Sequence, residues 1–130
     1  MAIEFEVLLE NQPGSLARLA TVLGDASVNI EAIQGRSDES ESVVRFLTDK
    51  PKHAAHVLEE AHVPFTQREV LIVRVLDQPG MLGDVALVMS EAGINIESVY
   101  ATTKGYLVLA VDDLAGAIQV AGGMAVMEAT

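Results

Sequence analysis

Two loops of nearly the same sequence are the parts of this chain best suited to hold an anion. They are the runs Asn11-Gln12-Pro13-Gly14-Ser15-Leu16 and Asp77-Gln78-Pro79-Gly80-Met81-Leu82. Proline presets φ for a turn, and glycine lets the backbone approach a ligand closely. A helix that begins after each glycine would point the N–H groups of its first two residues outward, at the positive end of its dipole. The pattern predicts a seat for a carboxylate at each loop.

A second candidate element is the pair Asn29-Ile30, which recurs as Asn95-Ile96. An asparagine side chain can accept from an α-ammonium group and donate to a carboxylate. With Asn11 and Asp77 as further acceptors, a zwitterion could be held without any arginine or lysine. On the residues alone a purely structural role stays open, because Asn and Asp at loop starts often bond their own backbone.

The loops belong to an internal repeat. Asp77 follows Asn11 at the same distance along the sequence as Ile94–Glu97 follows Val28–Glu31. Without a gap, residues 11–35 and 77–101 share ten identities, where average residue usage predicts about one or two. Further along, Ala54 matches Ala117 and Val57 matches Val120 at a shorter shift, so the second copy has lost three residues in its middle loop. We therefore predict two domains, at residues 1–68 and 69–130.

Each copy is predicted to fold in the order βαββαβ. Residues 3–9 alternate as a half-buried strand does, and the residues after each Pro-Gly turn follow helical spacing. The apolar stripe of these helices comprises Leu16, Leu19, Ala20, Leu23 and Ala26 in copy one, and Leu82, Val85, Ala86, Met89 and Ala92 in copy two.

Two β-branched runs, residues 28–33 and 42–48, predict the second and third strands, joined by a polar hairpin loop at 35–41. Residues 54–61 predict the second helix. Residues 63–68 predict a fourth strand that runs almost without a break into copy two. The fold class is α+β, with helices on one face of each antiparallel sheet.

The other face of each sheet differs between the copies. In copy one it carries Glu4, Glu6 and Arg45, so water can cover it. In copy two, residues 70–76 and 106–111 are apolar on both faces, as in strands buried on both sides. We expect another sheet to cover this one, from copy one or from a second chain, and a homodimer is the simplest form.

Composition excludes several classes of protein. Nineteen acidic and eight basic residues give a formal charge of −11, which would repel a nucleic acid backbone. No run of apolar residues is long enough for a membrane helix, and the first residues do not resemble a signal peptide, so we expect a cytoplasmic protein and no membrane partner. With no cysteine, disulfides and thiolate metal sites are excluded. We predict no cofactor.

The combination of Asn-x-Pro-Gly-x-Leu, a helix and Val-Asn-Ile resembles the ACT family of regulatory domains, and the Pro-Gly turn, the helix phase and Asn-Ile are found twice. The resemblance implies a ferredoxin-like fold with strand order 4-1-3-2, and amino acids bound at interfaces between paired domains. By similarity to the serine-sensing domain of 3-phosphoglycerate dehydrogenase, Asn11 and Asn29 match the ligand-contacting asparagines. Leu9 and Val75 stand where that sensor has a histidine, so the identity of the amino acid stays open.

These features predict a non-catalytic tandem ACT protein that senses a small amino acid and regulates an enzyme partner. Copy one, with the neutral Asn11, is expected to bind better than copy two, with Asp77. One alternative is a relative of the acetolactate synthase regulatory subunit: residues 8–33 resemble the start of that subunit, whose second half is a different domain and not an ACT copy. The other is a ferredoxin-like enzyme of the acylphosphatase type, which would need an arginine near its first loop, whereas Arg18 lies inside the predicted helix.

His53 and His56 are spaced one helical turn apart, with acidic residues nearby. We predict no metal site there, because a helix face rich in His, Lys and Glu is usually only solvated.

Overall fold

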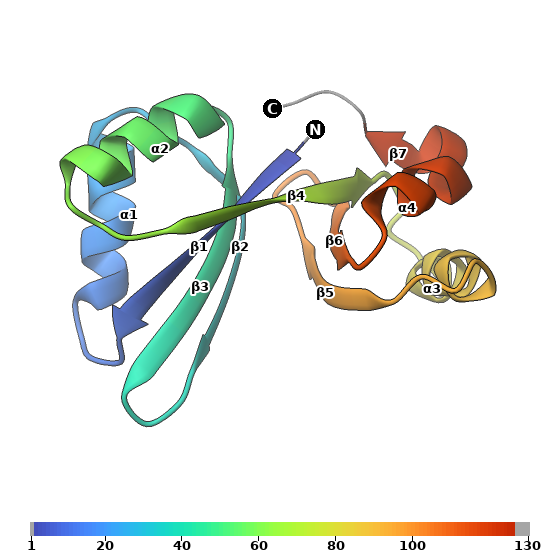
Figure 1. The fold of residues 1–130 in the computed structure, drawn as a ribbon, viewed down its shortest axis with the longest axis horizontal. Helices are drawn as coiled ribbons and strands as arrows, with labels where there is room; N and C mark the ends of the chain where they lie inside the picture. The colour runs from blue at the N-terminus through green and yellow to red at the C-terminus, as the bar shows by residue number, and fades with distance from the viewer. Residues whose placement is uncertain (1, 127–130) are drawn as a thin grey trace. The chain divides into compact units, whose positions relative to one another are not determined.

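The computed structural model describes residues 2–126, and it contains the βαββαβ order twice (Figure 1). Its elements are β1 (Ala2–Glu10), α1 (Ser15–Asp25), β2 (Ile30–Ser37), β3 (Glu41–Thr48), α2 (Pro51–Glu60), β4 (Thr66–Val73), α3 (Met81–Glu91), β5 (Ile96–Ala101), β6 (Leu107–Val111), α4 (Leu114–Ala121), a short 3-10 helix (Gly122–Met124) and β7 (Ala125–Val126). The predicted α+β class is confirmed. No helix within residues 2–126 is long and apolar enough to cross a bilayer.

The chain divides into two compact units. One comprises Ile3–Arg68, and the other comprises Glu69 onward together with Ala2. The division falls inside β4, so this strand supplies the last strand of the first unit and the first strand of the second. The strand order is β2-β3-β1-β4 in the first unit. In the second unit it is β5-β6-β4, with β7 paired to β4 as the fourth strand.

Pairing in the first unit is antiparallel, with Phe5 opposite Phe46 and Phe46 opposite Ile33. The hairpin between β2 and β3 is tighter than predicted. Gln34, Gly35, Arg36 and Ser37 pair with β3, and only residues 38–40 form the loop. The polar composition of residues 35–41 suggested a loop, but cross-strand hydrogen bonds hold most of them in the ladder.

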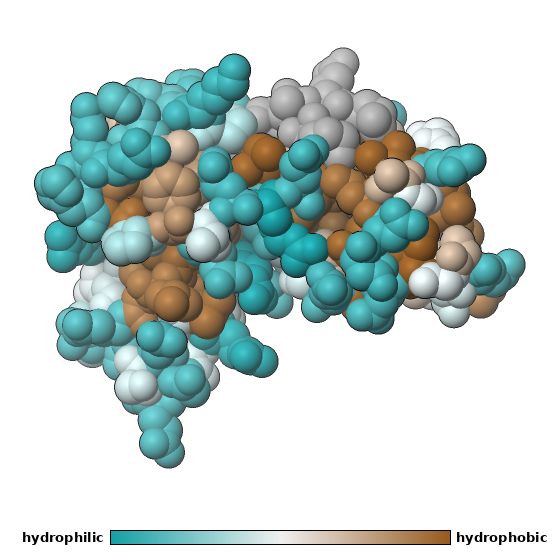
Figure 2. Space-filling view, viewed as in Figure 1, coloured by the Kyte–Doolittle hydropathy of each residue, from teal (hydrophilic) through white to brown (hydrophobic). Residues whose placement is uncertain are grey.

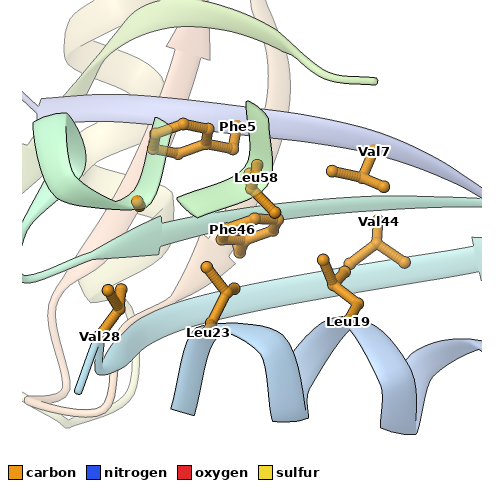
Figure 3. Close-up of a cluster of buried hydrophobic side chains, with 9 residues drawn as sticks. Phe5, Val7, Leu19, Leu23, Val28, Val44, Phe46 and Leu58 are labelled. Atoms are coloured by element: carbon orange, nitrogen blue, oxygen red, sulfur yellow. The ribbon is translucent and has the colours of Figure 1, made fainter. Parts of the chain in front are cut away.

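The core of the first unit lies between its helices and its sheet. Phe5 and Phe46 are fully buried and stack with ring centroids 5.4 Å apart, while Phe65 packs against Phe5 at 5.6 Å. Leu19 and Leu23 of α1 point into this cluster beside Val44 (Figure 3). Burial of such large apolar side chains is the main force that holds the unit together.

On the first helix of each unit, fewer residues are buried than the apolar spacing predicted. Leu19 and Leu23 are buried on α1, and Val85 and Met89 on α3. In contrast, Leu16 and Leu82 are 52% and 51% exposed. They occupy the first turn, next to the Pro-Gly loops, and are free to contact a ligand or partner.

The sheet faces that the helices do not cover were predicted to be exposed in copy one and buried in copy two; the first prediction is wrong at Glu4 and the second holds. Glu4 is only 2% exposed, on the same face as the buried Leu47 and Ala32, so water does not cover that end of the first sheet. Strands β4 and β6 are buried on both faces, as their composition predicted, from Val70 to Val73 and at Val108 to Val111. They are already buried within one chain, so this apolar face does not by itself require a second chain.

Candidate functional site

Each Pro-Gly loop is followed directly by a helix, as the sequence predicted. Gly14 has φ 93° and Gly80 has φ 90°, in the left-handed region, and each immediately precedes a helix. Neither helix start has a side-chain cap. The first amides of α1 and α3 therefore depend on other acceptors.

In each copy, one of the two backbone amides that we predicted to be free is hydrogen-bonded within the loop. Ser15 N–H donates to the Gln12 carbonyl and Met81 N–H to the Gln78 carbonyl, both with N···O 3.4 Å. These are long bonds, but they contradict our expectation that both amides are free. Next in each helix, the amides of Leu16 and Ala17, and of Leu82 and Gly83, have no acceptor among the described residues.

The Asn11 side chain is partly used by the protein itself. Its Nδ2 donates to the Asp38 carbonyl at 2.6 Å, and its backbone N–H donates to the Ser40 carbonyl at 3.0 Å. Both bonds fasten the Pro-Gly loop to the tip of the β2–β3 hairpin. The Oδ1 atom of Asn11 is left with no hydrogen bond from residues 2–126, and could still accept one from an ammonium group.

A hollow of about 340 Å³ lies between this loop and the β2–β3 hairpin. We call it the hairpin-side hollow; its polar side chains come from Glu10, Asn11, Gln12, Ser15, Arg36, Ser37 and Ser42. Arg36 is a cation at this hollow that the sequence analysis did not place there. In the β2–β3 register the Arg36 side chain starts from the sheet face opposite Val44. Its guanidinium can bind a carboxylate through two parallel hydrogen bonds, but reaches one held at the Leu16 amide only around the edge of β2.

The tip of the hairpin is ordered by Asp38. Its Oδ1 accepts from the backbone N–H groups of Ser40 and Glu41, each at 3.0 Å. The Glu41 bond, then the Ser40 bond, and to a lesser extent the charge of Arg36, lower the pKa of Asp38 below its usual 3.8. This turn holds the hairpin end where Arg36 lines the hollow.

Within one unit, Asn29 or Asn95 does not lie near the Pro-Gly loop. Each lies after the C-terminal end of the helix whose N-terminus carries the loop. An 11-residue helix separates them by about 16 Å. One unit therefore cannot place its own loop and its own asparagine on one small ligand.

The backbone at both asparagines is fixed in the same way. Asn29 N–H donates to Asp49 Oδ1 at 2.9 Å, and Asp49 N–H donates to the Asn29 carbonyl at 3.1 Å. Asn95 and Asp112 repeat this pair at 3.0 and 3.2 Å. The side-chain amides are not used in it. Sequence reasoning missed both aspartates, although they stand at equivalent positions of the two copies, each just after the third strand.

The hollow in the second unit has an uncharged lining. A hollow of about 400 Å³ at Asn95 is lined by Ala86, Ser90, Gly93, Ile94 and Ile96, without any charged residue. In the register that aligns Asn11 with Asp77, the counterpart of Arg36 is Thr102. An arginine at this position of the hairpin is thus found in the first unit and not in the second.

The outer face of α2 is hydrophilic (Figure 2). His56 Nε2 lies 3.0 Å from a Glu60 oxygen, and the His53 ring lies 3.2 Å from the Ala26 carbonyl. Within residues 2–126, no three His, Cys, Asp or Glu side chains come together as a metal site would require.

The sequence model for the ACT domain matches residues 3–63 and again residues 70–119. The chain belongs to the ACT domain family. Because both halves match, the second half is an ACT domain too, which argues against the acetolactate synthase-type alternative. No curated protein matches the sequence significantly.

Solved structures share this tandem ACT fold. A protein from Bacteroides thetaiotaomicron is 23% identical, with a TM-score of 0.85 over 92% of this chain and 85% of that one. The regulatory subunits of aspartate kinase from Thermus thermophilus and Thermus flavus are 17% and 19% identical. Their TM-scores are 0.69 and 0.65, over 92% of this chain and 89% of each subunit. At these identities the likeness concerns the fold.

Proposed function

We propose that this chain is a non-catalytic, amino-acid-binding regulatory protein, whose first ACT domain holds the ligand's carboxylate at the Pro-Gly loop. The observation that carries the proposal is the hairpin-side hollow. Its lining includes Leu16, whose amide lacks an acceptor among the described residues, and Arg36 at the edge of β2. An amide at a helix N-terminus and an arginine are both strong partners for a carboxylate.

The same hollow can accept an α-ammonium group. Glu10 and Asn11 both line it, and both carry side-chain oxygens that accept hydrogen bonds. Its volume of about 340 Å³ suits a small molecule. A free amino acid meets both requirements, because its carboxylate and ammonium groups are only two bonds apart.

In this proposal the domains are residues 1–68 and 69–130, and Asn29 or Asn95 of another ACT unit completes the site. That unit belongs to the same chain or to a second copy in a homodimer. A ligand held by two units favours the arrangement in which they meet, by no more than its differential affinity for the two arrangements. The output is regulation of an enzyme partner, in line with the aspartate kinase regulatory subunits of the same fold.

A thermal-shift screen of the full chain against the twenty amino acids tests this function. A ligand at a hundredfold its Kd stabilises the native state by about 2.7 kcal/mol. The affinity of each hit is then measured by calorimetry for the unchanged chain, Arg36→Ala and Lys52→Ala. Lys52 is a matched control, since it is an exposed cation of the first unit that does not line the hairpin-side hollow.

We expect Arg36→Ala to weaken binding at least about tenfold, as befits a charge-assisted hydrogen bond, while Lys52→Ala changes it less than about twofold. Asn29→Ala should weaken binding more than Asn95→Ala. The proposal fails if no amino acid stabilises the chain, or if the two cation variants behave alike. Hydrolysis of an acyl phosphate would instead indicate the enzymatic alternative.

A further inference from the structure

The outward side of α3 carries a large apolar residue. Leu87 is 58% exposed, while Val85 and Met89, two residues away on either side, are buried on the core side of the helix. At 3.6 residues per turn, the Leu87 side chain leaves the helix about 160° away from each of theirs. Leu87 therefore projects away from the core of the second unit.

The neighbours of Leu87 on the helix surface are small or acidic. Residues three and four positions apart lie beside one another on a helix, and for Leu87 these are Gly83, Asp84, Ser90 and Glu91, all exposed. Neither carboxylate has an ion pair with a residue in the described part of the chain. The small residues leave one side of the Leu87 side chain uncovered, and the two acidic residues stand along the other side.

On the uncovered side of Leu87, the surface of α3 has no charged residue. In order around the helix it consists of Gly83, Ser90, Ala86 and Leu82, which together with Leu87 we call the α3 face. Ala86 and Ser90 also line the uncharged hollow of about 400 Å³ at Asn95. The α3 face is thus an uncharged surface that continues into a hollow.

The helix α4, which packs beside α3, has no charged residue either. In the register that aligns Ala54 with Ala117, the α2 residues Lys52, Glu59 and Glu60 correspond to one alanine and two glycines of the second unit. Hydrophobic residues of α4 reach the surface, whereas the outer face of α2 is hydrophilic (Figure 2). The helices of the second unit therefore expose apolar surface where those of the first unit carry charges.

The first unit shows that the fold does not require the α3 face. With the repeat aligned at the Pro-Gly loops, Thr21 stands in place of Leu87, and Arg18 and Asp25 stand in place of its two acidic neighbours. An exposed threonine between one basic and one acidic residue is typical of a solvated helix. Because the two units share one fold, the leucine and the second acidic residue have a reason other than folding.

The charge of the second unit decides what kind of molecule fits this face. Residues 69–126 contain seven acidic residues and two basic ones, Arg74 and Lys104, and neither basic residue lies on α3 or α4. A second copy that met the α3 face through its own α3 face would place acidic residues against acidic ones. A partner with basic residues would instead complement them.

We infer that the α3 face binds a partner protein through an amphipathic helix whose apolar stripe is flanked by lysine or arginine. Leu87 packs into the apolar stripe, and Asp84 and Glu91 pair with the basic residues. The inference rests on the proposed function only in that a non-catalytic regulator acts through a partner. All residues of the α3 face belong to the second unit, whereas the hairpin-side hollow belongs to the first.

Calorimetric titration of the full chain with three synthetic peptides tests the inference. Each has about 18 residues, which exceeds the length below which an isolated helix is marginal in water. The first has a leucine stripe flanked by lysines, the second has the same stripe flanked by glutamates, and the third keeps the lysines but has alanine in place of leucine. We expect the leucine-lysine peptide to bind, and each of the other two to bind at least about tenfold more weakly.

Leu87→Gln should weaken binding of the leucine-lysine peptide at least about tenfold, because it removes a leucine that the complex buries. Glutamine has nearly the helix propensity of leucine, so the exposed substitution keeps the fold. Thr21→Gln, at the corresponding position of the first unit, is the matched control and should change binding by less than about twofold.

The acidic residues are tested by a double variant, Asp84→Asn with Glu91→Gln. It should weaken binding of the same peptide at least about threefold, as expected for the loss of two ion pairs. Its control, Asp25→Asn with Glu59→Gln, removes the same net charge from the helices of the first unit and should leave binding within about twofold.

The inference is overturned if the leucine-lysine peptide binds no more tightly than either of the other peptides, or if Leu87→Gln behaves like Thr21→Gln. A dimer of the unchanged chain that dissociates in Leu87→Gln, seen by sedimentation equilibrium, would assign the face to a second copy and reject the partner helix. Amino-acid binding is measured on the same samples. A chain that binds an amino acid but not the peptide rejects only this inference, and one that binds the peptide but no amino acid rejects only the proposed function.

Discussion

Replacement of Gly14 by alanine, with Gly80→Ala as its counterpart, separates the contribution of the loop to stability from its contribution to binding. The two glycines have nearly the same backbone conformation, φ 93° and 90°. A Cβ added at either would meet no atom within 4 Å. The cost of the substitution is therefore conformational and not steric.

An L-residue in the left-handed region costs about 1–2 kcal/mol. Alanine offsets about 0.4–1 kcal/mol of this by reducing the freedom of the unfolded chain. Each variant should therefore lose about 1 kcal/mol of unfolding free energy, and its thermal midpoint should fall by about 3–6 °C. Chemical denaturation and calorimetric melting measure these changes.

The binding effects should differ although the stability effects match. A shift of φ at residue 14 redirects the Leu16 amide away from the hairpin-side hollow, so Gly14→Ala should weaken amino-acid binding at least about tenfold, as expected when a ligand charge loses its hydrogen bond. Gly80→Ala should change it by less than about twofold, because the second unit has no Arg36 counterpart. Equal losses of affinity in both variants, or none in Gly14→Ala, would refute the reasoning.

Three further substitutions test the surrounding structure. Gly93→Ser, at the second unit's counterpart of Ser27, should lower the unfolding free energy by about 1 kcal/mol, since Gly93 has φ 73°; stabilisation, seen by urea denaturation, would contradict the left-handed geometry. Asp49→Ala should cost about 1–2 kcal/mol, because it removes the 2.9 Å bond to the Asn29 N–H, and unchanged stability would show that this bond contributes nothing. Asp38→Asn tests the lowered pKa of Asp38. A carboxyl group whose pKa is lower in the folded than in the unfolded state stabilises the fold above the unfolded-state pKa. It loses that contribution as pH falls through the folded-state pKa. The unfolding free energies of Asp38→Asn and the unchanged chain should therefore converge below about pH 3.8, and a constant difference in urea midpoints from pH 2 to 6 would oppose this.

The repeat, the element order and the core could be predicted from the sequence because they follow from local periodicity. Phe5 and Leu19 lie on the apolar faces of their elements, and the Pro-Gly turns fix the left-handed glycines. The periodicities are each contained within about ten residues of chain, and the repeat is visible because residues 11–35 recur at residues 77–101.

The polar lining of the site depended on tertiary structure and was not predictable in the same way. Arg36 lines the hollow because β2 pairs with β3 as far as Ser37, and the composition of residues 35–41 gave the opposite indication. The Asn11 amide is held by the Asp38 carbonyl, 27 residues away. The burial of Glu4 likewise could not be read from the alternation of its strand.

The central claim is that the backbone amides at the start of α1 bind the carboxylate of an amino acid. Its most direct test is a titration of the ¹⁵N-labelled chain, followed by NMR, with the amino acid that stabilises it best. We predict that the amide resonances of Leu16 and Ala17 shift progressively, whereas those of Leu82 and Gly83 stay in place. Saturation of binding without any shift at Leu16 or Ala17 would contradict the claim.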